Sequence, residues 1–164
     1  MADDRQQGYA LAHHIYAACG LERVVALRVN DRFGRTGIAE FRDAARRLGH
    51  PLGVELRWER GARDFTAQLD RIAETGAQAV VLWGFASDTA AVVRAIRKRE
   101  RRATDSAAPI RIFGCDRLVS PTFLAEAGDA AEGVVAVATY DPNREDSRLK
   151  EFVQAFAARF GHLP

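Results

Sequence analysis

Five side chains follow apolar runs of the sequence at points where a bound small molecule could reach them. In chain order they are Asn30, Phe33, Phe85, Ala86 and Asp116. An aromatic face attracts a cation, and a carboxylate forms a charge-assisted hydrogen bond with an amine. Phe33, Phe85 and Asp116 together therefore suggest half a pocket for a small cationic or zwitterionic molecule. The alternative is that strand ends need polar turn residues in any case. On that interpretation Asp31 caps the next helix, and Ser87 or Asp88 caps a later one.

Apolar patterns predict the elements that must position these residues. Strands are predicted at 23–29, 52–59, 79–83, 110–113 and 134–138. Helical stripes are predicted at 5–19, 35–48, 65–72, 87–96, 121–127 and 149–160. Alternating helices and strands with short connections favour a parallel sheet that has helices on both faces. We therefore expect an α/β fold, a Rossmann-like three-layer α/β/α sandwich around a mainly parallel five-stranded sheet. Small molecules bind at the carboxyl edge of such sheets.

The turn Gly34-Arg-Thr-Gly37 allows two interpretations. Two glycines at the start of a helix can cradle a phosphate, or they can simply let the helix pack close to its strand. The second interpretation is the more common one. The sequence also has no dinucleotide-binding, P-loop or nucleophile-elbow motif in the expected context. We therefore expect no catalytic residues, no enzyme activity and no cofactor.

Composition restricts the remaining classes of function. The chain has 164 residues, 48% of them apolar, and a formal net charge of +2, which fits one globular domain. Its four histidines and two cysteines have no metal-ligand spacing, so we expect no metal site. No run approaches ~20 apolar residues, so no membrane insertion of this chain is expected. The polar opening lacks the apolar core of a signal peptide, which leaves a cytoplasmic protein or an excised piece of a larger one.

A run of cations at 94–102 is the strongest local charge feature. It could bind nucleic acid, but such sites usually interleave aromatic residues with the cations. Cations at the end of a helix also complement the helix dipole and solvate the surface. We prefer this second interpretation and expect no nucleic-acid partner.

Six short motifs occur in order over nearly the whole chain. They are Asn30-Asp-x-Phe-Gly-Arg-x-Gly37, Arg63-Asp-Phe-Thr-Ala-Gln-Leu-x-Arg-Ile72, Ile112-Phe-Gly-x-Asp116, Ala127-Gly-Asp-Ala-Ala-Glu-Gly133, Tyr140-Asp-Pro142 and Phe160-Gly-x-x-Pro164. Together they resemble the type I periplasmic solute-binding proteins of ABC transporters, in particular the branched-chain amino-acid-binding group. Proteins of this group have two α/β lobes, joined by a hinge that is crossed three times, and they close on a ligand between the lobes.

The resemblance implies that residues 1–164 form a single lobe, the second of the two. It implies that Phe33 packs over the ligand and that Asp116 receives the ligand's ammonium group. Phe85 and Ala86 fall where the family faces its ligand, although Ala86 stands where some members have a bulkier residue. Asn30 belongs to the same motif as Phe33.

The function that the resemblance implies is binding of an amino acid or a related small molecule. The intact protein would be periplasmic or extracellular, associated with the membrane through a permease of an ABC transporter, and exported by a signal that these residues lack. A second function stays open: the same fold serves as the sensor domain of signalling and regulatory proteins.

Overall fold

Five parallel strands form the single sheet found in the described part of the chain, which comprises residues 3–102, 108–138 and 145–163 of a computed structural model. The strand order is β2-β1-β3-β4-β5, and every neighbouring pair is parallel. The strands are β1 Val24–Val29, β2 Val54–Trp58, β3 Ala79–Trp83, β4 Arg111–Gly114 and β5 Val134–Ala136. The predicted parallel five-stranded sheet is therefore confirmed.

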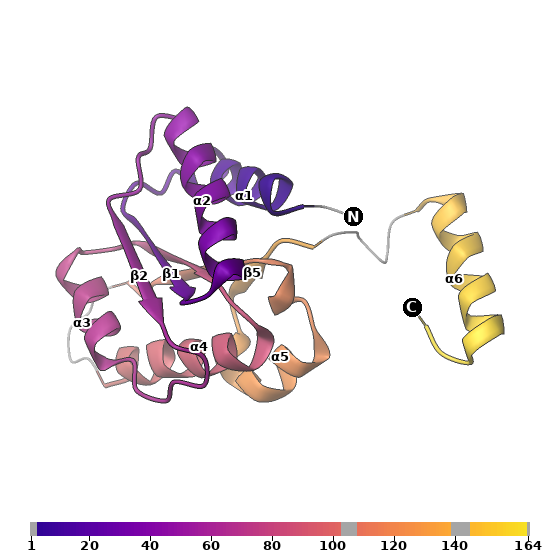
Figure 1. Cartoon of the computed structure of the whole chain (residues 1–164). Coiled ribbons are helices and arrows are strands. Elements are labelled where there is room, and N and C mark those ends of the chain that lie inside the picture. The colour runs from indigo at the N-terminus through magenta and orange to yellow at the C-terminus, as the bar shows by residue number, and fades with distance from the viewer. Residues whose placement is uncertain (1–2, 103–107, 139–144, 164) are drawn as a thin grey trace.

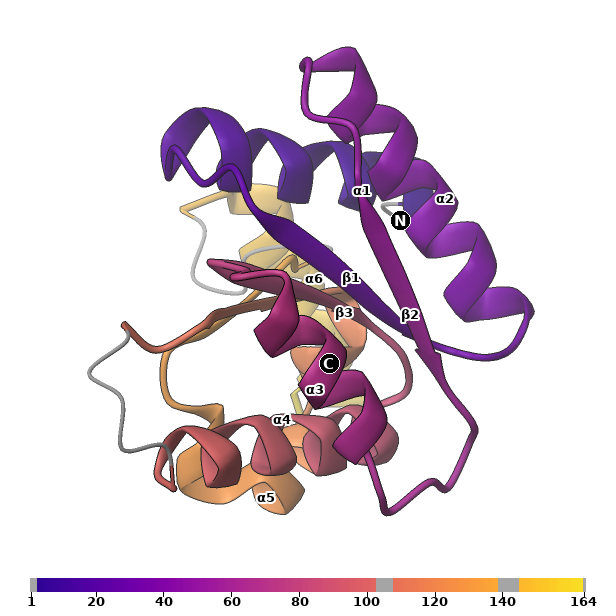
Figure 2. The same cartoon turned by 90° about the vertical axis from the view of Figure 1, so that its left-hand side faces the viewer.

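Helices cover both faces of this sheet. The described helices are α1 Asp4–Ala12, α2 Arg32–Arg47, α3 Thr66–Glu74, α4 Ala86–Glu100, α5 Pro121–Ala127 and α6 Ser147–Phe160, with a π-helix η1 at His13–Ala18 and short 3₁₀ turns η2 Asp116–Leu118 and η3 Gly128–Ala131; all of the α-helices except α6 pack on the sheet (Figure 1). Helices α1 and α2 lie on one face, and α3, α4 and α5 lie on the other (Figures 1 and 2). This arrangement is the predicted three-layer sandwich.

The central strands explain why the chain folds in this way. Every residue of β1 and β3 is buried, because helices cover both of their faces. Continuous apolar runs are typical of such strands, whereas the edge strand β2 alternates in exposure and buries fully only Trp58. Helix α6 stands away from the sheet (Figure 1), and none of its described residues is buried.

Two glycines let α2 approach the sheet closely. A Cβ atom at Gly34 would overlap the carbonyl oxygen of Val29, and one at Gly37 would overlap the indole ring of Trp83. Residues larger than glycine cannot occupy such positions without moving the helix. Close packing thus accounts for both glycines of the Gly34-Arg-Thr-Gly37 turn, and the phosphate-loop interpretation has no support from this geometry.

The first helix differs from its prediction as a single helix over 5–19. The chain changes from α-helix to π-helix at His13, and the backbone N–H of Cys19 donates to the carbonyl of His14 at 2.9 Å. This five-residue spacing also brings Cys19 Sγ to 3.6 Å from His14 Nε2. The apolar residues Leu11, Ile15 and Ala18 fit both kinds of helix, so the sequence pattern could not distinguish them.

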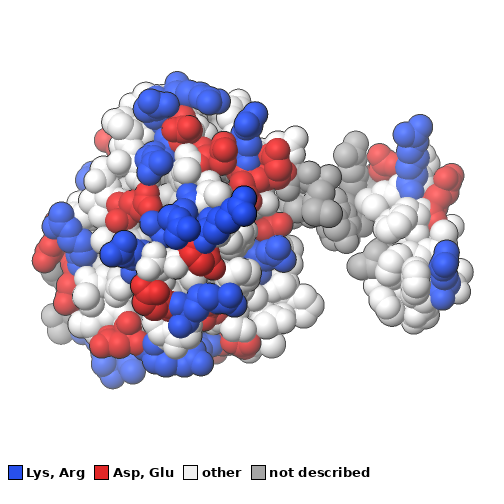
Figure 3. All heavy atoms as spheres, in the orientation of Figure 1, with Lys and Arg blue, Asp and Glu red and all other residues white. Residues whose placement is uncertain are grey.

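The surface carries mixed charge on the face seen in Figure 3, where Lys and Arg side chains lie among Asp and Glu side chains. Several arginines of the run 94–102 contact protein groups directly. Arg99 pairs with Asp70 at 2.6 Å, and Arg97 pairs with Glu100 at 2.9 Å. Arg94 donates to the carbonyl of Glu126.

Among the described helices none is both long and apolar enough to cross a membrane.

Candidate functional site

The five residues singled out in the sequence all lie at the carboxyl edge of the sheet. Asn30 directly follows β1, and Asp116 opens η2 after β4. Phe85 is the N-cap residue of α4, and Ala86 is its first helical residue. Phe33 lies in the first turn of α2, because that helix begins at Arg32, three residues earlier than predicted. All strands run in one direction, so these strand exits meet at one edge.

Two of the predicted aromatic residues are in contact. The ring centroids of Phe33 and Phe85 lie 5.2 Å apart with an interplanar angle of 37°. Phe33 also lies 6.3 Å from the ring of Trp83, which is fully buried in β3. Phe33 and Phe85 themselves are half-buried, so they form an aromatic surface that is supported from below and still reaches solvent.

Two arginines that the sequence interpretation overlooked cover this aromatic surface. The guanidinium carbon of Arg60 lies 4.5 Å from the centroid of Phe85, and that of Arg117 lies 5.8 Å from the centroid of Phe33. Arg117 follows Asp116 in η2, and Arg60 comes shortly after β2. The exit of β2 was the one strand end that the sequence interpretation did not consider, although parallel strands bring it to the same edge.

Asp116 is fixed through its backbone. Its N–H donates to Oε1 of Gln7 at 3.0 Å, and Gln7 is a buried residue of α1. The side chain of Asp116 is 26% exposed, and its Oδ1 lies 4.0 Å from Nε of Arg117. The carboxylate therefore faces the edge with a cation beside it.

Asn30 forms hydrogen bonds that join the ends of two neighbouring strands. Its side-chain Nδ2 donates to Oε1 of Glu59 at 2.5 Å, and its backbone N–H donates to the carbonyl of Trp58 at 2.7 Å. These bonds tie the end of β1 to the end of β2. Asp31 caps α2 as predicted, since its Oδ1 accepts from the N–H of Gly34 at 2.9 Å.

The predicted cap of α4 is wrong. Ser87 and Asp88 both lie inside the helix, and the N-cap residue Phe85 has no side-chain acceptor. Ser87 Oγ instead donates to Glu126 at 2.7 Å, and Asp88 Oδ1 accepts from the N–H of Gly61 at 3.1 Å. Both side chains are thus used in contacts between elements. The N-terminus of α4 remains without a side-chain cap.

Cys115 lies beneath this edge and is fully buried. Burial raises the pKa of its thiol to about 11, and Sγ lies 3.7 Å from the carbonyl of Gly84. A neutral buried thiol is a poor nucleophile.

In the described ranges no group of three His, Cys, Asp or Glu residues is placed to hold a metal ion. Tyr140 and Asp141 follow the fifth predicted strand, so the sequence places them at the same edge, but both lie outside the described residues.

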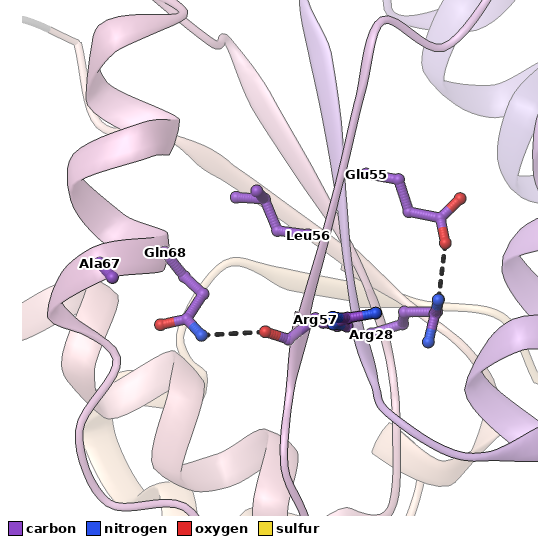
Figure 4. Close-up of a pocket in the computed structure, with 6 residues that line it drawn as sticks. All are labelled: Arg28, Glu55, Leu56, Arg57, Ala67 and Gln68. Atoms are coloured by element: carbon purple, nitrogen blue, oxygen red, sulfur yellow. Dashed lines mark hydrogen bonds and ion pairs between the residues drawn. The ribbon is translucent and has the colours of Figure 1, made fainter.

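Two cavities of the structure lie elsewhere. One, of about 370 Å³, opens along β2 beside α3 (Figure 4). Three of its polar side chains already have partners: Arg28 Nε donates to Glu55 Oε1 at 2.6 Å, and Gln68 Nε2 donates to the carbonyl of Arg57 at 2.9 Å. The other, of about 400 Å³, is an apolar hollow between α5 and β5. Neither cavity is lined by any of the five predicted residues.

Comparison with a family model gives a match over the whole chain. Residues 1–164 match the model of a family described as periplasmic binding protein. Comparison with curated proteins finds no match.

Solved structures agree with the family match. The chain is similar to a protein from Rhodospirillum rubrum assigned to a branched-chain amino acid ABC transporter, at 26% identity and a TM-score of 0.85. It is also similar to an ABC transporter substrate-binding protein from Sphaerobacter thermophilus, at 27% and 0.77, and to the leucine binding protein LivK from Thermotoga maritima, at 24% and 0.81. These alignments cover 100%, 97% and 98% of this chain, but only 45%, 43% and 44% of the respective proteins.

Proposed function

The chain belongs to the periplasmic binding protein family, and from this we propose that it forms one ligand-binding lobe of an ABC-transporter substrate-binding protein. The ligand would be an amino acid or a related small molecule. The observation that carries the proposal is the contact between Phe33 and Phe85 at the carboxyl edge of a parallel sheet, where Asp116 also follows its strand. Open α/β sheets bind their ligands at this edge.

The lobe offers one wall of a site. Phe33, Phe85 and Ala86 would contact the apolar part of the ligand, and Asp116 would accept hydrogen bonds from an amine. The chain spans less than half of the similar structures, so the opposite wall would come from a second lobe. A ligand that contacts both lobes favours the closed state by the free energy of its additional contacts. Binding would thus drive closure about the hinge.

The partner of the closed form would be the membrane permease of the transporter, and the protein would act in the periplasm or outside the cell. We propose no catalytic role, because the chain belongs to a family of binding proteins. A kinase or DNA-binding domain encoded beside residues 1–164 would instead indicate a sensor with the same fold.

Calorimetric titration of the intact two-lobed protein tests the proposal. The panel should contain the common amino acids, their amides and simple aromatic acids. Binding of at least one member with a 1:1 stoichiometry is expected. If no member of the panel binds, the transport function is wrong.

A further inference from the structure

The side chains of His14, Cys19 and Arg111 meet at the surface of the protein. Cys19 Sγ lies 3.6 Å from Nε2 of His14 and 3.3 Å from Nη2 of Arg111. His14 belongs to the π-helix η1, Cys19 directly follows it, and Arg111 begins β4, 92 positions after Cys19. Cys19 is partly exposed and the other two residues are exposed, so a small molecule can reach the thiol.

The π-helix accounts for the contact between His14 and Cys19. Residues five apart point to different sides of an α-helix, whereas a π-turn bonds them to one another and places them on one side. The N–H of Cys19 donates to the carbonyl of His14, and the two side chains meet as a result. Short π-helices are rare and occur frequently at functional sites.

One buried ring supports both partners of the thiol. The guanidinium carbon of Arg111 lies 5.3 Å from the centroid of Phe113, and the ring of His14 meets that of Phe113 edge-on at 5.9 Å. Phe113 is fully buried in β4. Among the described residues the side chain of Arg111 forms no ion pair with a carboxylate, so its positive charge remains available beside the sulfur.

These three side chains have the features of an activated nucleophile. An imidazole within reach of a thiol can take its proton as the sulfur attacks. Reactive cysteines lie partly exposed beside positive groups, and Arg111 is such a group. Cys115, by contrast, is fully buried and contacts the carbonyl of Gly84. The two thiols of this chain should therefore differ in reactivity.

We propose that Cys19 is a site of covalent modification by small disulfides that carry carboxylate groups. The sulfur of Cys19 attacks one sulfur of the disulfide, so a new S–S bond forms to Cys19 and the S–S bond of the small molecule breaks. His14 accepts the thiol proton and passes it to the departing thiolate. One small thiol leaves, and Cys19 is oxidised to a mixed disulfide. Arg111 attracts the carboxylate of the incoming molecule.

The modification site lies away from the candidate ligand site. β4 begins at Arg111, whereas Phe33 and Phe85 follow the carboxyl ends of β1 and β3. Since all the strands are parallel, their first residues lie at the opposite edge of the sheet from their last ones. The inference therefore does not rest on the proposed function, and either can fail alone.

Reaction of the intact protein with dithiobis(nitrobenzoate), a disulfide with two carboxylates, tests the inference. Peptide mapping by mass spectrometry measures the rate at each cysteine, and the same protein unfolded in urea gives the rate without the folded arrangement. Cys19 should react about fivefold or more faster in the folded protein than in the unfolded one, and Cys115 should react more slowly. Excess dithiothreitol should remove the added group. Reaction of folded Cys19 at or below the unfolded rate would overturn the inference.

His14→Gln tests the base. It should lower the rate at Cys19 about fivefold or more, because no imidazole then takes the proton. His13→Gln is the matched control, since this neighbouring exposed histidine contacts the ring of Tyr9 instead. It should leave the rate unchanged. Equal rates for His14→Gln and the wild type would show that the thiol is not activated, which also overturns the inference.

Arg111→Gln tests the preference for carboxylates. It should slow the reaction with dithiobis(nitrobenzoate) about threefold more than the reaction with dithiodipyridine, an uncharged disulfide. Arg71→Gln removes another exposed arginine, one that pairs with Glu74 on α3, and should slow neither reaction. If Arg111→Gln slows both reactions equally, Arg111 does not select anionic disulfides and the proposed class of modifier is wrong.

Discussion

Phe33 and Phe85 are 52 positions apart in the sequence, yet their ring centroids lie 5.2 Å apart because β1 and β3 are neighbours in the sheet. Each residue follows its strand by a few positions, so the parallel pairing alone is enough to bring the two rings together. A ligand would therefore meet an aromatic surface that exists before it binds.

Phe33→Ala should weaken ligand binding by about 1–2 kcal/mol, because it removes one of the two rings of that surface. Calorimetry on the intact protein measures this change. Leu124→Ala, at an exposed position on α5, is the control and should leave affinity unchanged. Equal affinities for wild type and Phe33→Ala would exclude this residue from the site.

Asp116→Asn distinguishes amine-bearing ligands from others. It should weaken an amine-bearing ligand by about 1.5–3 kcal/mol, since a charge-assisted hydrogen bond is lost. Benzoate has no amine, so its affinity should not fall. Competition titration with both ligand types on the same variant provides the comparison. Unchanged affinity for every amine would remove Asp116 from the ligand contacts.

Gly37→Ala should destabilise the fold by about 1–3 kcal/mol, because the new Cβ atom would overlap the Trp83 ring and force α2 away from the sheet. Denaturant unfolding measures the loss. Gly53→Ala is the control, since a Cβ atom there meets nothing within 4 Å. A Gly37→Ala variant as stable as the wild type would show that the helix can move without cost.

Glu55→Ala should lower the free energy of unfolding by about 2–3 kcal/mol. Glu55 accepts from Arg28 at 2.6 Å and from Arg42 at 3.1 Å, and the side chain of Arg28 is only 10% exposed (Figure 4). Loss of the carboxylate leaves a buried cation without its partner. Arg28→Met removes that cation and should cost less, which urea unfolding of the two variants can show. If Arg28→Met instead lowers the free energy of unfolding more than Glu55→Ala does, the ion pair itself stabilises the sheet.

Cys115 should make stability depend on pH in the alkaline range. Burial raises the pKa of its thiol from 9.0 to about 11, so at pH 10 the folded state holds a proton that the unfolded state has lost. The free energy of unfolding should therefore fall between about pH 9 and 11, by about 2–3 kcal/mol in total. Below pH 9 the thiol is protonated in both states and contributes no slope.

Cys115→Ala removes this contribution, and the difference between the two unfolding profiles isolates it from that of Tyr16, whose pKa burial raises to about 12. Parallel profiles for wild type and Cys115→Ala would contradict the assignment.

The sequence predicted the central elements well because burial alone defines them. The limits of β3 and α5 agree with the predicted 79–83 and 121–127. Element ends were less predictable where several side chains compete for one role. Ser87 and Asp88 are good capping residues, but Glu126 and the Gly61 N–H hold them in other contacts. Such contacts depend on the packing of distant segments, which a local pattern does not contain.

The candidate site shows the same limit. All five predicted residues lie at the expected edge, because strand direction and strand order determine where strand exits meet. Arg60 and Arg117 were missed because exposed arginines are common, and only the folded arrangement shows that they lie over the rings of Phe85 and Phe33. Whether any of these residues binds a ligand stays a prediction for the experiments above.

The amide of Gln68 has a consequence for the behaviour of the protein at high concentration. β2 lies at the end of the sheet, and an unpaired strand edge can recruit a strand from a second molecule and begin aggregation. Gln68 Nε2 already donates to the outward carbonyl of Arg57 (Figure 4). An incoming strand must displace this side chain before it can use that acceptor. One glutamine on α3 thus opposes edge-to-edge assembly at β2.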